Sequence, residues 1–160
     1  MTFDYAYQTV VSGETLFFAS STDGAVRAIN AKTGADRWTF DTNAPVRFAP
    51  ALYKDRMFVV GDDGFIYCLK ASNGALLWKK RGGPADRMVI GNDRMVSRWP
   101  VRGGAVVADD VLYVGAGIWP TEGIYLYALD PMTGETRWVN DTSGSLELDQ
   151  PHGGARAKSG

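Results

Sequence analysis

The chain has 160 residues, 45% of them hydrophobic, and 17 Lys and Arg offset 18 Asp and Glu to leave a net charge of −1. This is an ordinary globular composition, long enough for one sizeable core, and it carries no excess of positive charge that would favour nucleic acid or an anionic membrane surface. Cys68 is the only cysteine, which excludes an intrachain disulfide and a cysteine zinc cluster, and no apolar run is long enough for a membrane-spanning helix.

The predicted elements are short strands. Runs rich in β-branched and aromatic residues end at Gly, Asp or Ser, as strands do, and helical periodicity is hard to find. We expect the chain to be all-β. The clearest runs are residues 16–19, 57–60 and 111–114, and the expected inner strands of three successive sheets are residues 9–11, 48–52 and 101–107.

One pattern occurs three times along the chain. The segments AVRAINAKTGADRW, FIYCLKASNGALLW and IYLYALDPMTGETRW each give a short strand, a turn ending in Gly and a Trp four residues further on. We expect the glycines to adopt the positive φ that tight turns need, and the tryptophans to pack between neighbouring sheets. A small residue, expected to be buried, recurs before each turn. The three sets are Gly34, Gly74 and Gly134; Trp38, Trp78 and Trp138; and Ala28, Cys68 and Ala128.

The spacing of the repeats predicts a partial β-propeller. Trp38 and Trp78 are 40 residues apart, which suits a blade of four short antiparallel strands that must stack on its neighbours. Trp78 and Trp138 are 60 residues apart, because the third unit contains two insertions and not because a repeat is missing. We predict about three blades. They cover residues 1–40, 41–80 and 81–140, with insertions at 81–100 and 115–123, and residues 141–160 start a further blade.

The third repeat resembles the tryptophan-docking motif of the pyrroloquinoline quinone (PQQ) type β-propeller family. Ala128, Asp130, Thr133, Gly134 and Trp138 match the motif at every position. The first copy departs from it in one residue and the second copy in three. This resemblance covers about 140 residues and implies the propeller fold, but the family includes quinoprotein alcohol dehydrogenases, BamB-like assembly lipoproteins and large secreted repeat proteins, and the last group looks most similar. The departures are Asn30 in the first copy and Cys68, Lys70 and Asn73 in the second.

Both insertions are expected on one face of the propeller, because the connections between strands two and three, and between blades, emerge at the same end. An arginine-rich set with exposed tryptophans on that face predicts a recognition surface, with guanidinium groups binding anions and indoles stacking. Alternatively, the indoles close the loops and the arginines pair with nearby aspartates. The candidates are Arg98, Trp99, Arg102, Trp119 and His152. Replacing Arg98 and Arg102 by Ala is expected to weaken ligand binding with little loss of stability.

Three functions are compatible with the sequence. The first is a non-catalytic module that binds a protein, peptide or glycan and requires no cofactor or metal. The second, implied by the resemblance alone, is part of a dehydrogenase that uses PQQ with calcium in the full-length protein. The third is a scaffold without a ligand site. The resemblance also implies a periplasmic, cell-surface or secreted location, although no signal peptide is evident, and we expect the chain to be a fragment whose partners include the remaining blades.

Overall fold

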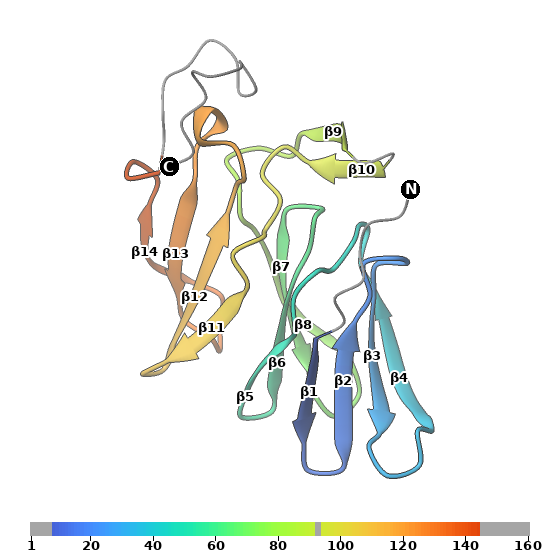
Figure 1. The fold of residues 1–160 in the computed structure, drawn as a ribbon. Coiled ribbons are helices and arrows are strands. Elements are labelled where there is room, and N and C mark those ends of the chain that lie inside the picture. The colour runs from blue at the N-terminus through green and yellow to red at the C-terminus, as the bar shows by residue number, and fades with distance from the viewer. Residues whose placement is uncertain (1–7, 92–93, 145–160) are drawn as a thin grey trace.

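The structure is a computed structural model that describes residues 8–91 and 94–144. Its described residues form three four-stranded antiparallel sheets and one two-stranded sheet. In Figure 1 the four-stranded sheets stand side by side, with β5–β8 between the other two, so the predicted all-β partial propeller is confirmed. The blades are β1 (Thr9–Ser12), β2 (Thr15–Ala19), β3 (Ala25–Asn30) and β4 (Asp36–Asp41); β5 (Ala51–Tyr53), β6 (Arg56–Val60), β7 (Phe65–Lys70) and β8 (Leu76–Arg81); and β11 (Ala105–Ala108), β12 (Val111–Ala116), β13 (Tyr125–Leu129) and β14 (Thr136–Asn140).

The middle sheet supplies apolar side chains to both of its neighbours. Along β6, Met57 and Val59 pack toward the first sheet, while Phe58 and Val60 pack toward the third. This alternation is the strand period of two, and because both faces of the sheet are covered, all four side chains are buried. The core therefore consists of two layers, one on each side of the middle blade.

Two of the three inner strands begin later than the sequence suggests. The second sheet starts at Ala51 rather than near residue 48, directly after Pro50, which has no N–H to donate to a strand ladder. The third starts at Ala105 rather than at residue 101. There the preceding Gly104 has a φ of +66°, which is not an extended conformation.

Each docking tryptophan lies on the glycine turn of the next blade. A Cβ on Gly74 would come within 2.6 Å of the Trp38 ring, and a Cβ on Gly134 within 2.9 Å of the Trp78 ring. Both glycines also have φ near +75°. Glycine is therefore required both by the close approach of the ring and by the backbone conformation. The Trp38 indole N–H donates to the Ala71 carbonyl at 3.1 Å, which fixes the first of these contacts.

The small residue of the motif lies opposite the tryptophan in the sheet. Ala28 pairs with Trp38, Cys68 with Trp78 and Ala128 with Trp138, and each small residue is fully buried. Because the register is the same in all three sheets, the expectation of one small, buried position per repeat is confirmed.

The third tryptophan does not pack between sheets in the part of the chain that the structure describes. Trp138 is 49% exposed, because no described sheet lies beyond β14. Its ring packs against Tyr113 of the same blade, with 6.1 Å between the ring centroids. The inter-blade role is thus seen for Trp38 and Trp78, and for Trp138 it stays a prediction.

The Cys68 thiol lies in the layer between the second and third sheets. Burial raises its pKa to about 11, so the reactive thiolate is scarce at neutral pH. We expect iodoacetamide to leave Cys68 unmodified in the folded protein and to label it fully in urea, as measured by intact-protein mass spectrometry. Rapid labelling under native conditions would contradict this packing.

Candidate functional site

The inter-blade connections and the β2–β3, β6–β7 and β12–β13 connections lie at one end of the sheets, here called the loop face (Figure 1). Both insertions belong to it, as predicted. They are joined by backbone hydrogen bonds, since the Gly117 N–H donates to the Pro100 carbonyl at 2.9 Å. The Ser97 N–H donates to the Asp62 carbonyl at 2.7 Å and ties the first insertion to the middle blade.

Trp99 is a structural residue of the loop face and not an exposed stacking surface. Its side chain is buried, with the residue 7% exposed, and it packs against Gly83, where a Cβ would lie 2.6 Å from the Trp99 side chain. The indole N–H donates to the Glu122 carbonyl, and Arg98 forms an ion pair with the Glu122 carboxylate while lying 5.6 Å from the Trp99 ring. Through these contacts with Glu122, Arg98 and Trp99 connect the two insertions. Because the Trp99 ring is buried, it does not offer a stacking surface to a ligand.

Arg102 also has a carboxylate partner within the protein. Its Nε and Nη2 donate to the two oxygens of Asp62 at 2.8 and 2.7 Å, and the Nε of Arg47 donates to the same carboxylate at 2.7 Å. Asp62 is 1% exposed, whereas the Arg47 and Arg102 side chains are 23% and 25% exposed. Two cations thus satisfy one buried carboxylate and join three loops. The nearby aspartates that the sequence offers as partners are Asp86, Asp93 and Asp109. The structure instead pairs Arg98 with Glu122 and Arg102 with Asp62, and Asp93 lies outside the described residues.

The next residue, Asp63, is buried beside Tyr67, whose hydroxyl donates to its carboxylate. Burial raises the pKa of Asp63 above its usual value, although the Tyr67 hydroxyl and the Phe65 N–H both favour the ionised form. Burial and the neighbouring Asp63 carboxylate also raise the pKa of Tyr67. These residues close the β6–β7 turn from the inside, and neither is presented to a ligand.

Two predicted candidates remain, and the Trp119 carbonyl accepts from the Glu122 N–H at 2.9 Å. Trp119 precedes the short helix η1 (Pro120–Glu122) as its N-cap and is half-buried. His152 lies outside the described residues. The structure therefore places Arg98 and Trp99 in one cluster, Arg102 in another and Trp119 at the start of a helical turn.

The first insertion contains a hairpin that the sequence reasoning missed. Strands β9 (Met88–Gly91) and β10 (Arg94–Ser97) pair antiparallel, with Ile90 directly opposite Met95. Met88 lies on the same side as Ile90 because it is two residues away. All three side chains are exposed, Ile90 by 81% and Met95 by 54%, whereas Val96 on the other side is buried. We call Met88, Ile90 and Met95 the hairpin face.

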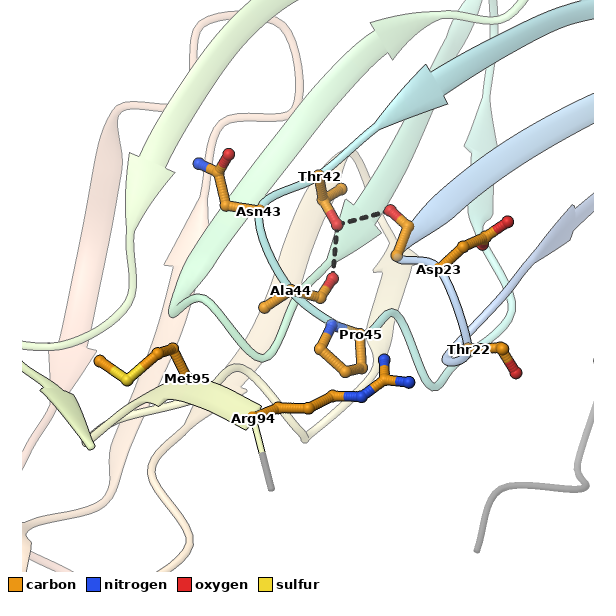
Figure 2. A pocket seen from close by; sticks show the side chains of 9 residues that line it. Thr22, Asp23, Thr42, Asn43, Ala44, Pro45, Arg94 and Met95 are labelled. Carbon is orange, nitrogen blue, oxygen red and sulfur yellow. Dashed lines mark hydrogen bonds between the residues drawn. The ribbon is translucent and has the colours of Figure 1, made fainter. Parts of the chain in front are cut away.

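A cavity of about 280 Å³ lies beside this hairpin, between it and the first blade. Figure 2 shows Arg94 extending along Pro45 toward Thr22, while Met95 lies at the other side. The Arg94 guanidinium donates to the Ser21 carbonyl at 2.9 Å and so holds the hairpin near the first blade. The other lining residues are Asp23, Gly24, Thr42, Asn43 and Ala44.

The family comparison covers most of the chain. Residues 5–138 match the family described as outer membrane protein assembly factor BamB, which is a PQQ-type repeat family. The chain belongs to this family. The resemblance predicted from the third repeat is therefore confirmed, and so is the propeller architecture that it implied.

Members of the BamB family share the fold and part of the sequence. The BamB of Yersinia pestis is 32% identical over an alignment of 90 positions, and the match covers 48% of this chain and 23% of that protein. The solved BamB of Moraxella catarrhalis has a TM-score of 0.64 and 27% identity over 87% of this chain and 40% of the other. The chain thus spans less than half the length of these BamB relatives.

A likeness to a quinohemoprotein alcohol dehydrogenase from Comamonas testosteroni shows the fold alone. The TM-score is 0.68 at 23% identity, over 83% of this chain and 20% of the other. Within residues 8–91 and 94–144, no three His, Cys, Asp or Glu side chains lie together to hold a metal ion. The carboxylate of Asp62 is held by the two guanidinium groups of Arg47 and Arg102.

Two signals in the sequence point to the features that were missed. The runs 88–91 and 94–97 flank Asn92-Asp93, and a pair of turn-forming residues between two short strand-like runs is a hairpin signal. The tripeptide Pro-Val-Arg occurs at residues 45–47 and 100–102, before the inner strands of successive blades. Its repetition marks the two arginines that converge on Asp62.

Proposed function

We propose that the chain is a non-catalytic protein-interaction module that binds an apolar segment of a partner protein through the hairpin face. The observation that carries this is the exposure of Ile90 and Met95, which lie opposite each other on an insertion at the loop face. Apolar side chains that gather at the surface often mark binding sites. Methionine adapts its shape to the partner, which suits Met88 and Met95 to recognition of irregular apolar surfaces.

The hairpin face is a better site for recognition than the arginine-rich set. Arg98 and Arg102 have carboxylate partners inside the protein, so an anionic or glycan ligand would have to compete with Glu122 and Asp62. Ile90 and Met95, by contrast, are already presented to solvent. Burying them against an apolar partner would contribute about 25 cal/mol for each Å² removed from water.

The names of the relatives support a protein partner at the cell envelope. Both the matching family and the Yersinia pestis relative are described as an outer membrane protein assembly factor. We propose that this chain likewise acts in assembly at the bacterial envelope, as a module of the propeller. In the described residues no helix is both long and apolar enough to cross a membrane.

Replacing Ile90 by Asp is expected to abolish partner binding without unfolding the propeller. Peptides selected from a random displayed library against the 160-residue chain serve as probes, and their affinities are measured by fluorescence anisotropy. We expect Ile90→Asp to weaken binding at least about tenfold, because a charge replaces the central apolar contact. The melting temperature should change little, since Ile90 is 81% exposed.

Two further variants separate binding from structure. Leu77→Asp introduces the same charge at an exposed apolar residue on the outer strand β8 and should leave peptide affinity unchanged. Ile90→Thr keeps the β-branched shape that suits a strand while removing apolar surface, and should weaken binding in the same direction. Equal affinities for the wild type and Ile90→Asp would exclude the hairpin face, and a saturable absorbance change with PQQ and Ca²⁺ would favour the dehydrogenase instead.

A further inference from the structure

The methionines of the chain differ widely in their access to solvent. Of the five in the sequence, Met1 lies outside the described residues and Met57 is fully buried between the first two blades. Met88, Met95 and Met132 are exposed, by 37%, 54% and 40%. Oxidants that accept two electrons convert the thioether of an accessible methionine to a polar sulfoxide. Three methionines in the described part of the chain are therefore open to this modification.

Two of these three methionines flank the central residue of the hairpin face. Met95 lies directly opposite Ile90, and Met88 lies on the same side of the hairpin because it is two residues from Ile90 on β9. Met88 is paired with Ser97, which places it diagonally across the hairpin from Met95. A partner that covers Ile90 therefore also covers both thioethers, so the polarity of the two sulfur atoms determines whether the contact is apolar.

Met132 is exposed to about the same extent as Met88 but differs in its position and bonding. It lies in the turn between β13 and β14, at the end of the sheets opposite the loop face (Figure 1). Its sulfur accepts a hydrogen bond from Arg56 Nε at 3.1 Å. This bond draws on the electron density with which the sulfur attacks an oxidant, so we expect Met132 to react more slowly than Met88.

We propose that oxidation of Met88 and Met95 to the sulfoxide regulates the hairpin face by abolishing its apolar recognition. This inference rests on the proposed function, because it assigns a regulation to the same surface. The oxidant is a peroxide. In the reaction the sulfur attacks one oxygen of hydrogen peroxide, an S–O bond forms and the O–O bond breaks, and the second oxygen leaves with both protons as water. The thioether loses two electrons and the peroxide gains them.

The sulfoxides are expected to change the hairpin face without unfolding the hairpin. A sulfoxide is polar, and burying it against an apolar partner without a hydrogen-bond donor is unfavourable. Met88 and Met95 are exposed in the free chain, so the oxidised groups keep their contact with water there. Binding should therefore weaken while the fold is kept. Methionine sulfoxide reductases restore the thioether, which makes the modification reversible.

Limited oxidation of the 160-residue chain with hydrogen peroxide tests this regulation. Peptide mapping by mass spectrometry should show sulfoxide first at Met95 and Met88, later at Met132, and at Met57 only in urea. The probes are library-selected peptides that bind the hairpin face. We expect two sulfoxides to weaken their affinity at least about tenfold in fluorescence anisotropy, and treatment with both classes of sulfoxide reductase to restore it. The midpoint of urea denaturation should not change.

Leucine variants separate these two methionines from the other sulfur atoms. Leucine is apolar and similar in volume to methionine but cannot be oxidised. The double variant Met88→Leu with Met95→Leu should therefore keep its peptide affinity after peroxide treatment. Met132→Leu is the matched control, and its affinity should fall on oxidation as that of the wild type does.

Ile90→Asp in the same assay distinguishes this regulation from the proposed function. If Ile90→Asp leaves the affinity unchanged, the proposed function fails and the regulation fails with it. If Ile90→Asp abolishes binding but the oxidised wild type binds as before, only the regulation is overturned. A loss of affinity in the peroxide-treated double leucine variant, or oxidation that reaches Met132 and leaves Met88 and Met95 intact, would also overturn it.

Discussion

Replacing Arg102 by Ala is expected to lower the free energy of unfolding by about 2–3 kcal/mol, because it removes two of the three guanidinium hydrogen bonds to the buried Asp62. A buried carboxylate that loses a partner costs more than the same pair at the surface. Arg47 remains as a partner of Asp62, and both arginine side chains are partly exposed, so the expected loss is smaller than for a fully isolated buried charge. Urea denaturation followed by tryptophan fluorescence measures the change.

Asp62→Asn in the Arg102→Ala background provides the control. If the loss comes from the uncompensated carboxylate, neutralising it should recover part of the stability. Arg47→Ala should lower the free energy of unfolding by less than Arg102→Ala, because Arg47 donates one hydrogen bond to Asp62 and Arg102 donates two. A change of less than about 0.5 kcal/mol for Arg102→Ala would mean that Asp62 is satisfied in another way.

This expectation reverses the one drawn from the sequence, where Arg102 was expected to contribute to binding and little to stability. The sequence shows an arginine near a tryptophan in an insertion, a pattern that fits an exposed face equally well. What it does not show is that Arg47, Asp62 and Arg102 meet, because they come from three loops at least 15 residues apart. Only the stacking of the blades brings these loops together.

The fold was more predictable than the site for a physical reason. Gly74 and Trp38 each leave a local signature, since the turn needs glycine and the sheet needs a large ring at a fixed distance along the chain. Repetition of that signature identifies the architecture from a single sequence. The burial of Trp99 depends instead on Gly83 and Glu122, whose contacts do not repeat along the chain.

Replacing Trp38 by Ala should be more destabilising than any of the loop substitutions, at about 3–5 kcal/mol. It opens a cavity between two blades and exposes the Gly74 turn, and large-to-small changes at such sites carry both a transfer and a cavity cost. This loss should not depend on protein concentration, because both sides of the contact belong to one chain. Denaturation at two protein concentrations checks both statements, and a loss below about 1 kcal/mol would contradict the docking role.

Replacement by Phe separates the ring from its hydrogen bond. The Trp38 indole N–H donates to Ala71, whereas the equivalent Trp78 N–H is buried and has no hydrogen-bond partner in the described part of the chain. Trp38→Phe therefore loses the hydrogen bond to the part-buried Ala71 carbonyl, at a cost of about 1 kcal/mol beyond the loss of ring area. Trp78→Phe removes a buried donor that is already unsatisfied, so the relief offsets part of the lost packing. We expect Trp38→Phe to be the more destabilising of the two, and the opposite order would mean that Trp78 finds a partner in solution.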